Sequence, residues 1–472
     1  MLLAIDMGNT QTAMGLFDGD ELVQSWRMPT DRSYTADEIH VRLMGFFKMY
    51  DLSLDTVDAI AFAGVVPQLS REWHAVADRI AADAIVIGPQ TAAVTKLRAA
   101  RPQAVGADRV ANAVAAETFY GAPAIVVDFG TATNIDVIDE DGYYIGGAIA
   151  PGIRISMDAL AARAAKLASV PLEAPDHAIG RDTEECIKVG AVTGAAAMAE
   201  GLVARMKREL GREDATVIAT GGLASIVAGS TDAFDVVDGQ LTIKGICEIY
   251  RRMQEQRYQY LSNVFKTLIV RDIVQRHSVR NESALLRIAD YMMDNVSNIT
   301  SARNITDVLN ADGLKITNKT VGKYMGYLCD AFAFYKVRRY DIRGKKYLKS
   351  GEKYYLADHA FKYALLGTRD MDWGRVYENM VAIELLRRGY EVYVGVLYKK
   401  EIDFVAIKRS EKLYIQVSDD ISSDKTFERE ISPLLSIGDA YPKMILARTH
   451  HETTDRDGVQ VVDLARWLAG EA

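Results

Sequence analysis

Cysteine is scarce in this chain of 472 residues, and its scarcity excludes several classes of protein. Cys186, Cys247 and Cys329 are widely spaced and odd in number, which argues against a disulfide framework and against a zinc site. We therefore expect a reducing, cytoplasmic setting. No run approaches the roughly 20 apolar residues of a membrane span, and the first residues lack the basic segment of a secretory signal.

Positive charge is also in short supply. The 56 Lys and Arg residues are outnumbered by 64 Asp and Glu, and the net charge of −8 argues against a uniformly basic nucleic-acid-binding surface, although a local basic stripe passes that test. The sequence has no Gly-x-x-x-x-Gly-Lys-Ser/Thr motif, so no P-loop ATPase module is expected. With 49% hydrophobic and 25% charged residues, the chain is typical of a folded protein of two or three domains.

The two halves of the chain differ in composition. Residues 1–245 are rich in Ala, Gly and Val and alternate apolar β-runs with helical patterns, which predicts an α/β fold with helices packed on mixed sheets. From about residue 250 alanine becomes rarer, Tyr, Arg and Lys become more frequent, and the pattern changes to amphipathic helices. Residues 237–261, where the halves join, contain no Pro/Ser-rich linker, so a continuous helix is expected there.

One hairpin pattern occurs twice in the first half. LLAIDMGNTQTAMGLFDGD (2–20) and AIVVDFGTATNIDVIDEDG (124–142) each place Asp-x-Gly and small hydroxyl or amide residues between two apolar runs. Asp6 corresponds to Asp128, and Gly8 corresponds to Gly130 at the same separation in the sequence. A single Asp-x-Gly after a strand is ordinary turn chemistry, whereas a duplicate with matching flanks favours nucleotide binding. The repeat predicts two related subdomains that face each other across a cleft.

The tips of these hairpins suit the phosphates of a nucleotide. Glycine lets the backbone approach phosphate oxygens closely, and the N–H groups of a turn can donate to them. The hydroxyls expected to donate as well are those of Thr10, Thr12, Thr131 and Thr133. The carboxylates of Asp6 and Asp128 would repel phosphate directly, so they would act through Mg²⁺ or its waters. A third Gly-rich turn, IATGGLA (218–224), suits an adenine or ribose.

A set of motifs in residues 1–250 resembles one family. The motifs are DMGNT (6–10), GADR (106–109), DFGTATN (128–134), GGAIAPG (146–152), RAAKL (163–167) and TGGLA (220–224). In this order they resemble the type III pantothenate kinases. That family belongs to the acetate kinase, sugar kinase, Hsp70 and actin superfamily, so the resemblance implies a duplicated ribonuclease-H-like core. It also implies ATP-dependent phosphorylation of pantothenate to 4′-phosphopantothenate, the first step of coenzyme A biosynthesis.

The resemblance assigns roles to particular residues. It implies that ATP is bound by Asp6, Met7, Gly8, Asn9, Thr10, Gln11, Thr12 and Thr131. It implies that pantothenate is bound by Gly106, Ala107, Asp108, Arg109 and Thr183. Asp128 is linked to a monovalent cation, K⁺ or NH₄⁺, and Asp6 to Mg²⁺ through water. Relatives pair as dimers, so the resemblance also implies a homodimer formed through the kinase half.

Asp108 is the expected catalytic residue. Phosphoryl transfer to an alcohol needs in-line positioning, charge neutralisation and an acceptor for the hydroxyl proton, and the Asp108 carboxylate can be that acceptor. Arg109 beside it can pair with the carboxylate of the substrate. Without the surrounding motifs, the better interpretation would be a surface ion pair at a helix start. Two positions depart from the family pattern: Ala99 stands where an aromatic residue is frequent, and Asn134 where many relatives have Thr.

Residues 283–357 have the pattern of three helices followed by a β-hairpin, which is the layout of a winged helix. The hairpin is basic through Arg338, Arg339, Arg343, Lys345 and Lys346. Such a hairpin could contact a phosphate backbone, or the domain could mediate protein contacts only. Both interpretations stay open.

Residues 374–450 partly resemble the PD-(D/E)XK nuclease core. Glu378 falls on a predicted helix and Asp403 in the strand EIDFVAI, as metal-binding acids of that core do. Gln416 stands at the third acid position and Ser418 at the lysine position, so little or no cleavage activity is expected. Residues 258–472 as a whole resemble the C-terminal half of prokaryotic ATPases that couple an AAA-type module to winged-helix and nuclease-like domains.

The sequence thus predicts four domains. Residues 1–115 and 116–250 form the two kinase subdomains, residues 251–357 a helical linker and winged helix, and residues 358–472 a degenerate nuclease-like α/β domain. The leading function is pantothenate phosphorylation. The alternative is a DNA- or partner-binding protein that acts through its C-terminal half, with a vestigial or regulatory kinase half. The three intact carboxylates of the kinase motifs argue against a vestigial kinase.

Overall fold

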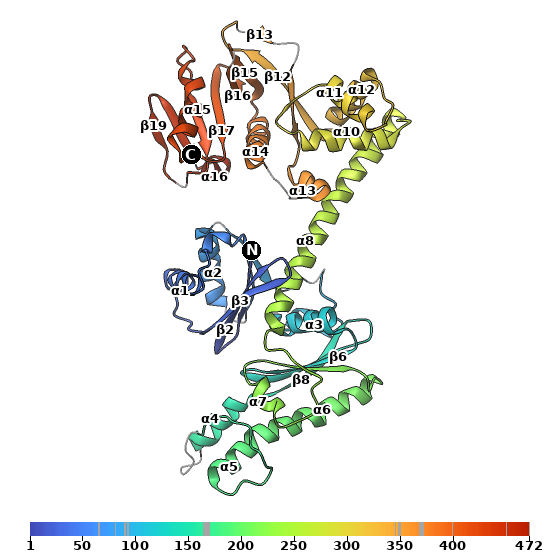
Figure 1. Ribbon diagram of the computed structural model, residues 1–472, viewed down its shortest axis with the longest axis vertical. Helices are drawn as coiled ribbons and strands as arrows, with labels where there is room; N and C mark the ends of the chain where they lie inside the picture. The colour runs from blue at the N-terminus through green and yellow to red at the C-terminus, as the bar shows by residue number, and fades with distance from the viewer. Residues whose placement is uncertain are drawn as a thin grey trace. The chain divides into compact units, whose positions relative to one another are not determined.

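A computed structural model describes most of the chain. The described residues are 1–64, 67–80, 82–88, 91, 94–163, 170–344, 346–347, 351–367, 372–398, 400–449 and 451–471. Lys345 of the basic hairpin and residues 164–167 of the RAAKL motif lie outside them. The chain divides into two compact units, Met1–Gln256 and Arg257–Ala472 (Figure 1).

Two five-stranded mixed sheets form the first unit. The first sheet has the order β3-β2-β1-β4-β5 and the second the order β10-β9-β6-β7-β8. Strands of the first sheet are β1 (Leu2–Met7), β2 (Gln11–Asp18), β3 (Glu21–Pro29), β4 (Ala59–Gly64) and β5 (Asp83–Ile87). Strands of the second are β6 (Ala124–Phe129), β7 (Ala132–Ile138), β8 (Tyr144–Pro151), β9 (Thr216–Thr220) and β10 (Val236–Val237).

The two sheets share one topology. In each, the first three strands form an antiparallel meander and the last two lie parallel to the first strand. The duplicated hairpins of the sequence are β1–β2 and β6–β7. The prediction of a duplicated ribonuclease-H-like core is therefore confirmed for this unit.

Helices cover these sheets on both faces. They are α1 (Ala36–Met49), α2 (Pro67–Arg79), α3 (Ala107–Tyr120), α4 (Ile153–Arg163), α5 (Thr183–Lys188), the π-helical η4 (Val189–Thr193), α6 (Gly194–Leu210) and α7 (Ala224–Ala228), with single 3₁₀ turns η1 (Leu54–Thr56) and η3 (Pro102–Ala104). Helix α1 pairs Thr35 with Glu38 in a capping box and buries Ile39, Leu43 and Phe47 on the first sheet. Helix α3 packs against both sheets, so its first turn lies where they meet.

One helical stretch of the described residues, Thr183–Leu210, is long and apolar enough to pass a length and composition test for a membrane span. The sequence analysis did not anticipate this result. Its Ala195, Ala196, Ala199 and Val203 belong to the core of the second sheet. Core helices of water-soluble proteins pass the same test, so this single helix is weak evidence for a membrane span.

Helix α8 (Leu241–Thr267) contains the boundary between the units, which confirms the continuous helix expected there. The second unit continues with η5 (Leu268–Val274), α9 (Gln275–His277), α10 (Glu282–Asp294), α11 (Ala302–Ala311), α12 (Asn318–Asp330), α13 (Ala360–Leu366), α14 (Trp373–Arg387), α15 (Asp424–Leu435) and α16 (Leu464–Ala469). Side chains of Asn281, Ser301 and Thr317 cap α10, α11 and α12, which explains why these helices begin where they do.

A single ten-stranded sheet runs through the second unit, in the order β11-β14-β12-β15-β16-β17-β18-β20-β19 with β13 beside β12. Its strands are β11 (Ile299–Thr300), β12 (Phe334–Asp341), β13 (Lys346–Tyr347), β14 (Glu352–Leu356), β15 (Glu391–Leu397), β16 (Lys400–Lys408), β17 (Glu411–Ser418), β18 (Lys443–Ala447), β19 (Thr454–Arg456) and β20 (Val459–Asp463). The apolar cores on its two faces include residues of α14 and α16 on one side and of α15 on the other.

The parallel pairing of β12 with β15 carries this sheet across the domain boundary predicted at residues 357 and 358. The predicted β-hairpin and the predicted nuclease-like region are therefore continuous in one sheet. The division of the chain into four domains stays a prediction.

Candidate functional site

The two hairpin tips of the first unit touch. Thr10 Oγ1 lies 2.9 Å from Thr131 Oγ1, so the turn after β1 and the turn after β6 are joined by a hydrogen bond between residues far apart in the sequence. Asp6 and Asp128 stand near the ends of these two strands. The repeat therefore does bring its two acidic tips to one place.

Strand register decides which side chains face the space between the sheets. Asp6 pairs with Ala13, whereas Met7 pairs with Thr12, and successive residues point to opposite faces. Met7 and Thr12 are buried, and the Thr12 hydroxyl bonds to Thr30 Oγ1 at 2.9 Å. Thr133 is buried in the same way in the second sheet. The hydroxyls of Thr12 and Thr133 therefore occupy the core-facing register, and their contacts with phosphate stay a prediction.

Two glycines allow the second tip to pack closely. Gly221 has a φ of +92°, and a Cβ there would lie 2.4 Å from Asp128 Oδ1. A Cβ on Gly152 would lie 2.2 Å from the carbonyl oxygen of Thr131. Close packing thus explains one glycine in each of the TGGLA and GGAIAPG motifs, because only glycine leaves room for the backbone beside the acidic tip.

Helix α3 delivers further polar groups to the same place. Asp108 lies in its first turn, against Gly106. One turn later Asn112 is buried, and its Nδ2 donates to Asp128 Oδ2 at 3.1 Å. The hydroxyl of Thr242 donates to Asn112 Oδ1 at 2.8 Å, which fixes the orientation of the amide. Sequence analysis missed Asn112, although its spacing of four from Asp108 put it on the same helix face.

The carboxylates influence one another strongly. Burial raises the pKa of Asp6 to about 8, with further contributions from the charges of Asp108 and Asp128. Burial and the charge of Asp108 raise the pKa of Asp128 to about 6, while the hydrogen bond from Asn112 and the charge of Arg27 oppose the rise. Three acidic groups therefore share one electrostatic neighbourhood, which favours binding of a cation.

A fourth carboxylate, Asp136 on β7, holds Arg109. Nε and Nη2 of Arg109 both lie 2.7 Å from Asp136 Oδ1. Asp136 is fully buried, and its Oδ2 has no hydrogen-bond partner among the described residues. Burial raises the pKa of Asp136 to about 7 and outweighs the effect of the Arg109 charge. The Arg109 guanidinium also lies over the ring of Tyr144, 5.5 Å from its centroid. Sequence analysis gave no role to Asp136 or Tyr144.

The remaining predicted residues are placed as follows. Asn9, Thr10, Gln11 and Thr131 are exposed at the tips. Gly106 and Ala107 lie at the start of α3 beside Asp108. Thr183 is exposed at the start of α5, where the hydrogen bonds described are local ones, such as Asp182 capping Glu185. The contacts described for α5 do not join Thr183 to the other predicted pantothenate residues.

Comparison with known proteins agrees with this arrangement. A family model described as type III pantothenate kinase matches residues 2–205. The curated type III pantothenate kinase of Thermomicrobium roseum is 47% identical over 255 residues, which are 54% of this chain and 98% of that relative. The enzyme of the same name from Streptomyces griseus is 45% identical over 260 residues, with 53% and 98% covered. The chain belongs to the type III pantothenate kinase family.

Other matches extend the comparison. Solved structures similar to the pantothenate kinase half include a Thermus thermophilus ROK hexokinase (TM-score 0.29, 13% identity, 53% of this chain and 99% of that one). An activator of 2-hydroxyisocaproyl-CoA dehydratase from Clostridium difficile with bound ADPNP has a TM-score of 0.35 at 13% identity, over 55% and 97%. The family assignment rests on the sequence relatives. Residues 247–372 match a domain of unknown function, DUF8612.

A second polar cluster lies in the second unit. Glu378 is on α14 and Asp403 on β16, as the sequence predicts, and the structure adds Lys353 from β14. Lys353 Nζ lies 2.9 Å from Glu378 Oε1 and 2.9 Å from Glu401 Oε1. Burial raises the pKa of Glu378 and of Asp403 above the ordinary range, opposed by the Lys353 charge. A lysine from another strand therefore supplies the positive charge that Ser418 cannot.

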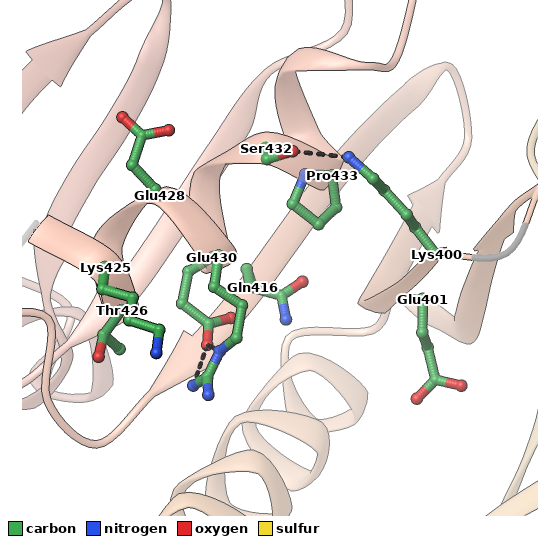
Figure 2. A pocket seen from close by; sticks show the side chains of 10 residues that line it. Lys400, Glu401, Gln416, Lys425, Thr426, Glu428, Glu430, Ser432 and Pro433 are labelled. Atoms are coloured by element: carbon green, nitrogen blue, oxygen red, sulfur yellow. Dashed lines mark hydrogen bonds and ion pairs between the residues drawn. The ribbon is translucent and has the colours of Figure 1, made fainter.

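Gln416 and Glu401 connect this cluster to an open cavity of about 1000 Å³ (Figure 2). The other side chains that line the cavity are Lys400, Lys425, Thr426, Glu428, Arg429, Glu430, Ser432 and Pro433. Lys400 donates to Ser432 Oγ at 2.6 Å, and Arg429 pairs with Glu430. Cations and carboxylates alternate around the cavity, so it is not a basic groove.

Removing the buried charge at Asp136 should change how stability depends on pH. An acid whose pKa is raised by folding costs stability as pH rises from its unfolded value to its folded value, here from about 4 to about 7. Asp136→Asn does not carry this cost, so its Tm relative to the unaltered protein should increase between pH 4 and pH 7 and stay level above pH 7. Each kcal/mol of stability gained corresponds to about 2–4 °C in Tm. Thermal unfolding of the full-length variant and of the unaltered protein, at a series of pH values, measures the two Tm values. A difference that stays constant with pH would contradict the raised pKa.

Lys353→Met should leave two buried carboxylates without a counter-charge and destabilise the second unit by about 3–5 kcal/mol. Amide hydrogen exchange in peptides from residues 373–418 of the full chain should become faster. The double variant Lys353→Met with Glu378→Gln should recover part of the lost stability. Lys336→Met is the control, because its ion pair with Glu352 is more exposed than that of Lys353 and worth about 1 kcal/mol. Equal effects of the two lysine variants would rule out a buried role for Lys353.

Proposed function

We propose that this chain catalyses ATP-dependent phosphorylation of pantothenate to 4′-phosphopantothenate, the first step of coenzyme A biosynthesis. The observation that carries the proposal is the contact between the two hairpin tips, Thr10 to Thr131, with Asp6, Asp108 and Asp128 acting on one another beside it. The names of the curated relatives support the choice of substrate.

The reaction transfers one phosphoryl group. The pantothenate hydroxyl oxygen attacks the γ-phosphorus of ATP, the bond from that phosphorus to the bridging oxygen of ADP breaks, and the hydroxyl proton passes to the Asp108 carboxylate. Backbone N–H groups of the turn after β1 and the hydroxyls of Thr10 and Thr131 hold the phosphates. These residues bind and orient the nucleotide, so the chemistry is mostly positioning and charge stabilisation.

Arg109 is our proposed partner for the carboxylate of pantothenate. Asp136 contacts Nε and Nη2 of the guanidinium through one oxygen, which holds it in a fixed orientation. A guanidinium has five N–H donors, so others stay available to a substrate carboxylate. Asp136 is therefore a positioning residue in this proposal. Gly106, Ala107 and Thr183 complete the proposed pantothenate contacts.

The acidic groups fit a cation that arrives with the nucleotide. Among the described residues no three His, Cys, Asp or Glu side chains form a metal site by themselves. Mg²⁺ in kinases is held by one or two carboxylates together with the substrate phosphates, and the raised pKa values of Asp6 and Asp128 mark a place where positive charge is lacking. Asp6 would hold Mg²⁺ through water and Asp128 a monovalent cation. When bound, such ions neutralise charge on the phosphates.

Asp108→Asn tests the proposed base. The amide cannot accept the hydroxyl proton, so pantothenate-dependent ADP formation by the full chain should fall about 10²–10⁴-fold in kcat, with little change in the Kd for ATP. A coupled assay with and without pantothenate measures this. Pantothenate-dependent turnover that survives unchanged in the variant would remove Asp108 from its role, and its absence in the unaltered chain would contradict the proposed function.

Asp128→Asn tests the proposed monovalent cation site. Turnover by the unaltered chain should rise when Na⁺ is replaced by K⁺ or NH₄⁺, and the variant should lose this response together with part of its activity, because a neutral amide binds a cation more weakly. Initial rates in matched chloride salts measure both effects. A K⁺ response retained by the variant would place the cation elsewhere.

We also infer the architecture of the second unit. Helices α10, α11 and α12 followed by the β12–β14 hairpin, with β11 pairing β14, support a winged helix. The order α14, β15, β16, β17, α15 and β18 supports a nuclease-like core without cleavage activity. Arg339 lies 3.9 Å from Glu401, and Arg343 lies over the Tyr398 ring, so two of the predicted wing cations already have local partners.

A homodimer and a cytoplasmic location complete the proposal. Exposed apolar side chains gather on β8 and α4 of the second kinase sheet, namely Ile145, Ile149, Ile155 and Leu160. A second copy of the kinase half would remove them from water.

A further inference from the structure

Arg27 on β3 is a cation that acts on the acidic tips and has no role in the proposed reaction. Its charge lowers the pKa of both Asp6 and Asp128, so the guanidinium acts on the two acidic tips together. A positive group that influences both tips lies where a nucleotide's negative charge would be placed.

Strand register explains how Arg27 reaches this place. Arg27 pairs with Ala13, and Ala13 pairs with Asp6, so the three form one row across β3, β2 and β1 on the same face of the sheet. Neighbouring strands are about 4.8 Å apart, so Arg27 stands roughly 10 Å from Asp6 along this row. The small side chain of Ala13 between them leaves room for a long side chain to lean towards the tips.

The guanidinium reaches the second sheet. Nη2 of Arg27 donates to the carbonyl oxygen of Gly239 at 2.9 Å. A Cβ atom placed on Gly222 would lie 3.6 Å from Nη1, so Arg27 also lies beside the TGGLA turn. The neighbouring Gly221 of that turn packs against Asp128. In the part of the chain that the structure describes, no carboxylate lies within ion-pair distance of Arg27. Among the described residues Arg27 therefore has no direct ion-pair partner, whereas Arg109 is held by Asp136.

We propose that Arg27 binds the terminal phosphates of ATP and exchanges its hydrogen bond to the Gly239 carbonyl for phosphate oxygens. The proposal rests on the proposed function in taking ATP as the nucleotide. Three carboxylates repel a triphosphate, so a guanidinium opposite them lowers the cost of bringing it in. Its planar fork matches two phosphate oxygens, and a charged donor binds phosphate more strongly than a neutral one.

This exchange also couples nucleotide binding to the two sheets. Arg27 belongs to the first sheet, whereas Gly222 and Gly239 follow strands β9 and β10 of the second. A phosphate bound between them replaces a direct contact between the sheets by one that passes through the ligand. Arg27 is thus a binding residue for the nucleotide rather than a fixed strut.

The test compares ATP with AMP, which lacks the terminal phosphates. In full-length Arg27→Gln, the Kd for Mg²⁺–ATP should rise about 10- to 100-fold by titration calorimetry, while the Kd for AMP stays unchanged. Arg27→Lys keeps the charge but loses the fork, so its Kd for ATP should be intermediate. Arg42→Gln is the matched control, because Arg42 lies on α1 over the Tyr34 ring.

Each outcome either supports or overturns the contact between Arg27 and the terminal phosphates. An ATP-specific loss in Arg27→Gln, absent from Arg42→Gln, supports the phosphate contact. An unchanged Kd for ATP overturns it, as does an equal loss for ATP and AMP with a lowered Tm, which would mean that Arg27 only ties the sheets together. These binding measurements need no pantothenate. An ATP-specific loss in a chain that does not phosphorylate pantothenate would therefore contradict the proposed function and leave the Arg27 contact standing.

Discussion

The candidate site of the kinase half depends on one constraint: the carboxyl groups of Asp6, Asp108 and Asp128 act on one another electrostatically, and burial makes the negative charge of Asp6 and Asp128 costly. Asp6 and Asp128 come from a hairpin built twice, and Asp108 from the helix that packs against both sheets. Burial, and after it the negative charge of Asp108, raises the pKa values of the two hairpin acids and makes their surroundings favourable for positive charge. The charge of Arg27 opposes this rise at both acids, and the hydrogen bond from Asn112 opposes it at Asp128.

The sequence predicted the duplicated core because hydrophobic patterning repeats with its turn chemistry, and the two sheets have equivalent strand orders. It predicted the acidic tips for the same reason. It did not single out Arg27 or Asp136, because a lone arginine and a lone aspartate in strands carry no motif, and only the pairing register places them. It did not anticipate that the side chains of Thr12 and Thr133 are buried, which follows from the alternation of side chains along a strand.

In the second half, the sequence placed the acidic residues of the cluster but missed their positively charged partner. Helix and strand patterns located Glu378, Asp403 and Gln416 on the elements expected of them. The counter-charge came from Lys353, 25 residues before Glu378 and on a strand outside the predicted nuclease-like region. A motif defined by spacing cannot find a side chain that arrives through sheet pairing. Lys353 therefore offsets part of the negative charge of the acid cluster from within the same sheet.

The most direct test of the account is a crystal structure of the full chain with a non-hydrolysable ATP analogue, Mg²⁺ and pantothenate. The account predicts terminal phosphates between the turns after β1 and β6, with the pantothenate hydroxyl within hydrogen-bonding distance of Asp108. Nucleotide density outside that space, or a hydroxyl turned away from Asp108, would contradict it.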